Sequence, residues 1–299
     1  EKSLYRFGQS GTQTNLNRDI VADIEFTWLT KPEQTRIAEI LSTADEAIAH
    51  TEALIAKYQR IKTGLMQDLL TKGIDENGNI RSKASHKFVV RNGIEVPVEW
   101  EVELLRKNVN IQGGYSFKSS DFTSSGIQLI RIGNLYNNVL DLNREPIYLP
   151  ESFEKNHPSF VLKGGDIILS MTGTYGKRDY GFAIMLPENS KFLLNQRVCR
   201  FFYDDNIFRD FLLLLLRSEN YLSQLFINVT GSKQGNLNTS NILDILVRLP
   251  RKDEQIRIVE KVESAEKNIN DLIKNRIKLQ SLKTGLMQDL LSGKVRVKI

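Results

Sequence analysis

Apolar side chains recur at alternating spacings of four and three residues in two long stretches of the chain. The first stretch begins at Ile37 and the second at Ile258. This spacing is the heptad pattern of a coiled coil, in which the apolar positions of one helix pack against those of another. Polar residues interrupt the pattern at Thr51, Lys62, Arg276 and Lys283. The pattern predicts two helices of about 40 residues, each roughly 60 Å long.

The two stretches are copies of one element. The nonamer Lys62–Leu70, KTGLMQDLL, recurs letter for letter at Lys283–Leu291, an offset of 221 residues. The same offset aligns Glu33–Ile37 with Glu254–Ile258 without a gap. A helix of this length cannot bury its own apolar stripe, so the nearest partner of each copy is the other copy. Either direction of packing is open, and we favour the antiparallel one.

The repeat divides the chain into segments. Gly73 and Gly293 follow the last periodic residues, where a glycine commonly ends a helix. Asn15–Asn17 align at the same offset with Asn236–Asn238, so the first residues resemble the end of the domain that lies between the helices. The predicted segments are a remnant of a first domain at 1–32, a helix at 33–73, the intervening domain at 74–250, a second helix at 251–293 and a tail at 294–299.

The intervening domain alternates short apolar runs with glycine turns such as Gly113-Gly114 and Gly164-Gly165. This pattern is typical of short strands. Strands are predicted at 95–102, 127–132, 166–171, 182–186 and 198–202, followed by helices at about 206–218 and 220–229. The predicted fold class is therefore α+β, with one mixed domain around one core and two long helices.

Composition narrows the class further. The longest apolar run, Phe211–Leu216, is far short of the roughly 20 residues that span a bilayer. Cys199 is the single cysteine, and the three histidines show no ligand spacing, so neither a disulfide framework nor a metal site is expected. We expect a cytoplasmic protein without a membrane partner. The chain opens at Glu1 without a methionine, which is consistent with a fragment or a processed form.

Catalytic motifs are missing from the sequence. Gly173–Arg178 lacks the spacing and the hydroxyl residue of a phosphate-binding loop, and no histidine accompanies a nucleophile in a recognised pattern. Asp204 and Asp205 are adjacent carboxylates, but they occupy a polar turn. We therefore expect a protein that is not an enzyme and binds no cofactor of its own.

Glycine-flanked polar loops are the remaining candidates for chemistry. Each carries hydroxyl, amide and basic side chains, which are the groups that contact phosphates and base edges of DNA. A single loop of this kind is more typical of an ordinary surface, but several in one nearly neutral domain favour a contact surface. The predicted DNA-facing residues are Lys118, Ser119, Ser120, Thr174, Tyr175, Lys177, Arg178, Gln196, Arg197, Lys233 and Gln234.

Taken together, the residues resemble a known family. A variable domain, then Glu-Gln-x-Arg-Ile opening a long helix that ends Leu-Met-Gln-Asp-Leu-Leu, then the same helix again, resembles the specificity subunit of type I restriction–modification systems. The domain body is similar to that family's target recognition domain at Gly114–Phe122, Ile130–Leu135, Lys163–Ile168, Leu194–Arg197 and Gly231–Leu237. The resemblance covers the whole chain.

The resemblance implies a role in a larger enzyme. The domain would read one half of a bipartite site in double-stranded DNA, and the helices would set the gap between the halves and dock methyltransferase subunits. Those partners would hold S-adenosylmethionine, and restriction subunits would hydrolyse ATP. This chain would hold neither cofactor.

Two alternatives stay open. A full-length member has two complete recognition domains, so the chain is either a truncated piece or a half-type subunit that pairs with itself and reads a palindromic site. A different class of protein, a coiled-coil adaptor whose α+β domain binds a protein or a small ligand, also fits the composition. Only the first class predicts sequence-selective, salt-dependent DNA binding.

Overall fold

The computed structural model describes residues 28–227 and 234–299 of the chain. The predicted domain remnant at 1–32 lies almost wholly outside the described residues. The chain divides into two compact units, one formed by residues 61–265 and the other by residues up to 60 together with 266–299. Each of the long helices contributes one stretch to each unit, so the units do not coincide with the segments that the repeat predicts.

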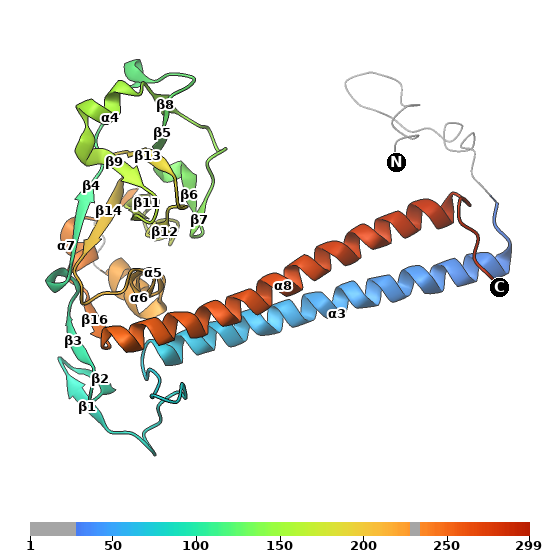
Figure 1. Ribbon diagram of the computed structural model, residues 1–299, viewed down its shortest axis with the longest axis horizontal. Coiled ribbons are helices and arrows are strands. Elements are labelled where there is room, and N and C mark those ends of the chain that lie inside the picture. The colour runs from blue at the N-terminus through green and yellow to red at the C-terminus, as the bar shows by residue number, and fades with distance from the viewer. Residues whose placement is uncertain (1–27, 228–233) are drawn as a thin grey trace. The chain divides into compact units, whose positions relative to one another are not determined.

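The two predicted long helices are α3, Lys31–Leu69, and α8, Lys252–Leu291. They run antiparallel, because the start of α3 packs on the end of α8: Ile37 shares a small buried cluster with Leu290. Further along, the Lys283 ammonium lies 2.5 Å from the Asp45 carboxylate. The fold is thus α+β with an antiparallel helix pair, as the sequence predicted, and the two helices are seen in Figure 1.

Several of the predicted heptad positions form the seam of this pair, although Tyr58, four-three spaced with them, is 39% exposed. Ile55 and Ile269 are buried, and the polar interruption at Thr51 is buried too. Its hydroxyl donates to the carbonyl of Ala47 at 2.8 Å, which satisfies the group inside its own helix. The ion pair of Lys283 with Asp45 engages a polar seam position with the opposite helix, a contact that favours one register.

The domain of the larger unit is built on two four-stranded sheets (Figure 1). The first is antiparallel, in the order β12 (Ala183–Met185), β10 (Ile167–Ser170), β14 (Val198–Tyr203) and β4 (Val109–Gly113). The second has the order β8 (Tyr148–Leu149), β5 (Ile127–Ile130), β13 (Lys191–Leu194) and β9 (Val161–Lys163), with β13 parallel to β5. Ile168 and Val198 of the first sheet share one buried cluster with Ile130 and Leu194 of the second.

Smaller elements complete the domain. Two-stranded ribbons pair β1 (Phe88–Arg91) with β2 (Ile94–Pro97), β3 (Glu101–Leu104) with β16 (Leu246–Leu249), β6 (Leu135–Tyr136) with β7 (Val139–Leu140) and β11 (Thr172–Thr174) with β15 (Gln234–Asn236). The helices are α4 (Ser152–Asn156), α5 (Arg209–Leu216), α6 (Glu219–Ile227) and α7 (Thr239–Leu243), with 3-10 turns η1 (Leu105–Lys107), η2 (Ser119–Asp121), η3 (Ile132–Asn134) and η4 (Pro158–Phe160).

One strand prediction is wrong. The run 95–102 does not form one strand, because the chain turns where the N–H of Trp100 donates to the carbonyl of Pro97 at 3.0 Å. The turn places Trp100 fully inside the main core, where its indole N–H donates to Glu254 at 3.0 Å. The two halves of the run become β2 and β3, which pair with different strands. A buried aromatic ring thus overrides the local strand pattern.

The main core joins the α+β domain to the nearby ends of the two long helices. Leu69 and Leu70 of the α3 end and Ile258, Val259 and Val262 of the α8 start belong to the same buried cluster as the domain's strands and helices. Among the described residues, no helix is long and apolar enough to cross a membrane.

Candidate nucleic-acid interface

The turn between β13 and β14, residues 195–197, lies where the predicted contact loops meet. The N–H of Gln196 donates to the carbonyl of Tyr115 at 3.0 Å, and the N–H of Met171 donates to the carbonyl of Arg197 at 2.9 Å. The first bond ties the turn to the loop after β4, and the second ties it to the residue that precedes β11. Exposed Gln196 and Arg197 are therefore mounted on a backbone that is held from both sides.

The loop after β4 can reach the turn because it begins with a glycine. A Cβ on Gly114 would lie 2.1 Å from the carbonyl oxygen of Asn195, far inside van der Waals contact. With no Cβ in the way, the N–H of Tyr115 donates to the carbonyl of Leu194 at 3.0 Å. Gly114 thus permits a close approach of two backbones, which explains why this position carries no side chain.

An aromatic cluster supports the same loop. Tyr115 packs against His157 with ring centroids 4.5 Å apart, and Phe117 lies 5.4 Å from the same imidazole. Phe153 and Phe160 complete the cluster around His157. Phe117 is buried, whereas the next residues along the chain, Lys118, Ser119 and Ser120 around η2, are exposed. The buried ring of Phe117 anchors a segment whose polar side chains face solvent.

The β11–β15 ribbon joins the second predicted loop to the third. Thr174 pairs with Gln234 and Gly173 with Gly235. The ring of buried Tyr180 lies against both glycines, since a Cβ at Gly173 or Gly235 would approach Tyr180 to 2.3 or 2.4 Å. The glycine pair therefore makes room for the ring, and the ring fixes the ribbon that carries the polar loops.

Residues 175–178 form the tip of the second loop. Within this tip, Gly176 adopts the left-handed conformation with φ of 74°. Asp179 closes the loop by accepting from the N–H of Thr174 at 2.8 Å. Burial opposes ionisation of Asp179, but the hydrogen bonds from Thr174 outweigh it and lower the pKa of this carboxyl. Tyr175 and Lys177 are exposed at the tip.

Arg178 is engaged within the domain. Its guanidinium lies 2.7 Å from the carboxylate of Glu219 and 5.5 Å from the ring centroid of Phe226, both on α6. Because both groups are largely exposed, the ion pair is weak, yet it holds the side chain against α6. Arg178, one of the predicted DNA-facing residues, thus has its guanidinium engaged by α6.

A pocket of about 380 Å³ opens beside the central turn. It is lined by Arg131, Ile132, Gly133, Glu145, Asn195, Gln196 and Arg197. The Arg131 guanidinium donates to the backbone carbonyl of Glu145 at 2.8 Å and lies 3.8 Å from its carboxylate. The pocket therefore contains one internally neutralised pair and one further cation, Arg197.

The structure thus brings several predicted residues together and leaves others apart. Thr174 and Gln234 are paired in one ribbon. Gln196 and Arg197 occupy the turn to which Met171, the residue before β11, is hydrogen-bonded. Lys118, Ser119 and Ser120 follow the loop that the same turn holds. Lys233 lies outside the described residues. The sequence did not single out Arg131, Asn195 and Tyr180, whose positions depend on contacts between distant strands, and Gly173 and Gly235 become neighbours only in the folded ribbon.

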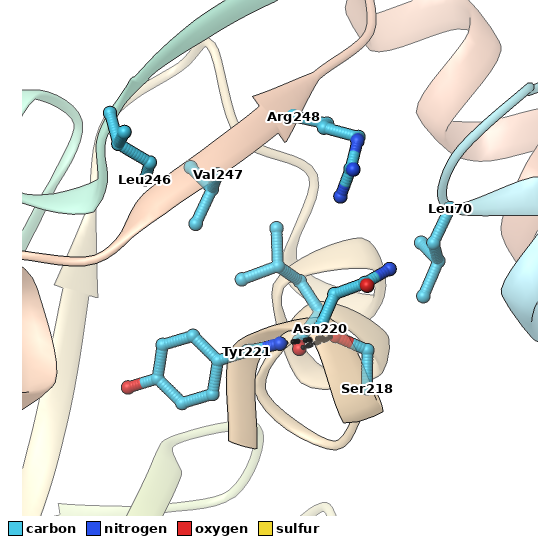
Figure 2. Close-up of a pocket in the computed structure, with 8 residues that line it drawn as sticks. Leu70, Ser218, Asn220, Tyr221, Leu246, Val247 and Arg248 are labelled. Atoms are coloured by element: carbon cyan, nitrogen blue, oxygen red, sulfur yellow. Dashed lines mark hydrogen bonds between the residues drawn. The ribbon is translucent and has the colours of Figure 1, made fainter. Parts of the chain in front are cut away.

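One crevice in the domain is too small to hold a ligand. The crevice where the α3 end meets α6 and β16 holds about 20 Å³, room for about one water molecule. Figure 2 shows its lining, with Arg248 of β16 opposite Asn220 of α6.

Burial raises the pKa of the Cys199 thiol to about 12, so this thiol is a packing group. Across residues 28–227 and 234–299, no cluster of three or more His, Cys, Asp or Glu side chains is placed to hold a metal ion.

With the geometry in view, comparison with known proteins defines the class. Residues 97–280 match the family described as the type I restriction modification DNA specificity domain. This match covers more than half of the chain, which therefore belongs to that family.

Individual relatives agree. The specificity subunit of the type I restriction enzyme MjaVIII from Methanocaldococcus jannaschii is 31% identical over 286 residues, covering 95% of this chain and 65% of that protein. The EcoAI specificity subunit from Escherichia coli is 28% identical over 181 residues, covering 60% of this chain and 30% of that protein. The chain thus spans just under two thirds of the length of the MjaVIII subunit.

Solved structures share the fold. A chain from a study of complex assembly and conformational transition of the type I R-M system superposes with a TM-score of 0.64 at 17% identity, covering 98% of this chain and 68% of that one. The HsdS subunit from Thermoanaerobacter tengcongensis gives a TM-score of 0.57 at 16% identity, with 98% and 67% covered.

Proposed function

We propose that this chain is the DNA-reading component of a type I restriction–modification enzyme and contacts one half of a bipartite site. The observation that carries the proposal is the convergence of separate polar loops on the turn at 195–197. Loops that are distant in sequence present hydroxyl, amide and basic groups on one rigidly held backbone. Such a surface suits base edges and phosphates, and family membership supports the same role.

The exposed lysines are suited to the DNA backbone. Lys118 and Lys177 are each exposed at a polar loop, and Lys177 also interacts electrostatically with the nearby carboxylate of Asp179. A lysine is a flexible point charge and suits a phosphate more than a base edge. The exposed hydroxyls of Ser119, Ser120 and Thr174 add neutral donors that also contact phosphates.

The test is the salt dependence of DNA binding by the full chain. Replacing Lys177 with Ala should weaken binding to all sequences and reduce the slope of log K against log salt concentration by about 0.9, the value for one phosphate contact. Lys274→Ala on α8 is the matched control, because Lys274 is an exposed lysine in the helix pair. Wild-type binding without salt dependence or sequence preference would contradict the proposal and favour the adaptor class.

The helix pair is proposed to dock methyltransferase subunits through the repeated nonamer. The two copies have different surroundings: Leu70 of the first is buried in the main core, whereas Leu291 of the second is 50% exposed. Internal packing therefore does not explain why all nine residues are the same. A partner that contacts both copies does explain it.

Two glycines support this interpretation. Gly64 and Gly285 lie inside long helices, where glycine is less stable than alanine by about 0.5–1 kcal/mol. A Cβ at either position would meet no atom of this chain within 4 Å. Ile61 and Leu282, one turn earlier in each copy, are 49% and 58% exposed. Close approach of a partner's helix to each glycine would account for both features.

Docking of this kind would give each subunit of the enzyme a separate role. The partner methyltransferase subunits would supply S-adenosylmethionine and methylate DNA, and restriction subunits would supply ATP-driven cleavage. This chain would supply sequence selection, and its paired helices would set the distance between two half-sites. Copurification with the cognate methyltransferase subunit tests the docking, and its loss in the Leu282→Asp variant is the expected result.

A further inference from the structure

We infer that a partner subunit places an acidic segment in a basic pocket beside the first nonamer copy, where Arg248 pairs with its carboxylate. This contact rests on the proposed docking of a methyltransferase subunit and adds the chemistry of one part of that docking. The pocket opens where α3 ends and has a volume of about 590 Å³. Its charged lining consists of Lys72, Arg81, Lys83, Arg248 and Glu95.

Arg248 is the cation of this pocket without a counterion. The other three cations each pair with a carboxylate of the chain: Lys72 with Asp68 at 2.8 Å, Lys83 with Glu95 at 2.7 Å, and Arg81 with Glu254. Within the described part of the chain, the guanidinium of Arg248 makes neither a hydrogen bond nor an ion pair, and its Nε is buried. One positive charge of the lining is therefore left uncompensated.

Burial distinguishes Arg248 from an ordinary surface arginine. Desolvation lowers the pKa of its guanidinium, and no neighbouring carboxylate opposes this shift. Withdrawing a cation from water is unfavourable unless an anion compensates it. Arg144, by contrast, is exposed and stays hydrated. A carboxylate that enters the pocket would offset the desolvation of Arg248.

The basic pocket continues the surface of the first nonamer copy. A second pocket, of about 340 Å³, is lined by Met66 and Gln67 of the nonamer on one side and by domain residues 217–220 on the other. The small crevice of Figure 2 joins the two, because it shares Leu70 with the second pocket and Arg248 with the basic one. A partner that lies along the nonamer therefore reaches Arg248 without leaving its docking surface.

The lining favours a protein segment over nucleic acid. Phe88 and Ile94 are half-buried and line the same pocket as Arg248. A DNA backbone, which is charged at every phosphate, would leave these apolar side chains uncovered, whereas a peptide can cover them beside its carboxylate. Of the described side chains that the sequence predicts to face DNA, none lines this pocket. An acidic peptide segment therefore fits the site better than DNA does.

The experiment measures the affinity of the full chain for the cognate methyltransferase subunit without DNA, by isothermal titration calorimetry. Wild type is compared with Arg248→Met, Arg248→Glu and the matched control Arg144→Met. Arg248→Met keeps an unbranched apolar side chain and removes the charge, so Kd should rise at least about 30-fold. Arg248→Glu should weaken binding further, because it repels the incoming carboxylate. Arg144→Met should bind like wild type.

Thermal denaturation of the free chain separates pairing with a partner from a role in folding. Arg248→Met should unfold at the same temperature as wild type or at a higher one, because it removes an uncompensated, partly buried charge. Weaker partner binding with unchanged or greater stability is the expected combination. A lower unfolding temperature that accompanies the loss of binding would make Arg248 a packing residue and overturn the inference.

Partner binding and DNA binding distinguish the inference from the proposed docking. Equal partner affinities of wild type and Arg248→Met would overturn the inference and leave methyltransferase docking standing. An Arg248→Met variant that keeps its affinity for the partner but loses affinity for a DNA duplex would assign the pocket to a phosphate, which also overturns the inference. If wild type forms no complex with the methyltransferase subunit, both the docking and the inference are wrong.

Discussion

The two ends of the helix pair place the same repeated glutamate in different surroundings. Glu254 at the start of α8 accepts from the N–H of Ile74 at 3.0 Å, from Arg81 at 3.1 Å and from the indole of Trp100 at 3.0 Å. Its counterpart Glu33 in α3 accepts from the N–H and hydroxyl of Thr30, at 3.1 and 2.8 Å, and from Arg296 at 2.5 Å.

The shared feature is that the segment following each helix returns to the start of the other. Arg81 follows α3 and binds Glu254 in α8, whereas Arg296 follows α8 and binds Glu33 in α3. The two arginines differ in burial: the side chain of Arg81 is 8% exposed and that of Arg296 is 65% exposed. One motif therefore closes both ends, but the domain turns one of the two ion pairs into a buried network.

The next residue shows the same contrast. Gln255 is fully buried, accepts from the N–H of Phe208 at 2.7 Å and donates to the carbonyls of Asn206 and Pro250. Its counterpart Gln34 is exposed and donates to the carbonyl of Leu29 at 2.9 Å. Leu29 and Pro250 are equivalent in the repeat. The helix start thus carries one bond in both copies, and the domain adds the others.

Removing Glu254 should have the largest effect. Glu254→Ala leaves the guanidinium of Arg81 buried without its counterion, which should cost about 3–5 kcal/mol in the free energy of unfolding. Glu33→Ala should cost clearly less, because Arg296 remains in solvent. Urea denaturation of both variants measures the difference, and equal losses would contradict the contrast between the two ends.

Gly73 comes next. Its φ is 66°, and a Cβ there would lie 2.2 Å from Glu254 Oε1 and 2.4 Å from the ring of Trp100. Gly73→Ala should therefore destabilise the larger unit by at least about 1–3 kcal/mol through backbone strain, with the clash adding to this. Thermal denaturation monitored by tryptophan fluorescence tests it. A variant as stable as wild type would mean that the network tolerates displacement.

Acid should destabilise the end of the helix pair that contains Glu33. Side-chain hydrogen bonds from Arg296 and then Thr30 lower the pKa of Glu33 from 4.5 to about 2. A lowered native pKa means that the stabilisation is complete above about pH 4.5 and is lost as the pH falls toward 2. Acid titration of Glu33→Gln and wild type, followed by circular dichroism, should show the smaller pH dependence in the variant. Parallel curves would exclude the contribution.

The smallest effect on stability concerns the nonamer. Gly64→Ala and Gly285→Ala should each stabilise the free chain by about 0.5–1 kcal/mol, since both helices gain propensity without a clash. The same substitutions should weaken copurification with the methyltransferase subunit, because the added methyl group obstructs a close approach. Stronger helices with unchanged partner binding would place the docking surface elsewhere.

The two long helices were predictable because the spacing of apolar residues along each one is sufficient to mark its buried face. Spacing along the chain marks Ile37 and Ile258 as seam positions, and both are buried. The antiparallel direction was a preference, and the contact of Ile37 with Leu290 establishes it. By contrast, the division at Trp100 was missed, because a ring that is buried against a distant glutamate leaves no trace in the strand pattern.

The contact surface was predictable only in part. Loop composition predicts Thr174 and Gln196 as candidates, but backbone bonds such as that of Met171 to Arg197, which join their segments, are not readable from composition. The engagement of Arg178 by Glu219 was equally invisible, since the two residues are separated by forty-one positions. Residue type marks which loops are candidates for DNA contact, and tertiary contacts determine which of their side chains remain exposed.

The most direct test of the central claim is reconstitution of the full chain with its cognate methyltransferase subunit, followed by mapping of methylated positions on a random-sequence DNA library. Methylation confined to a split motif with a gap of fixed length is the expected result. A palindromic motif would add that two copies of this chain act together. A stable complex that methylates without sequence preference would contradict the claim that this chain selects the DNA.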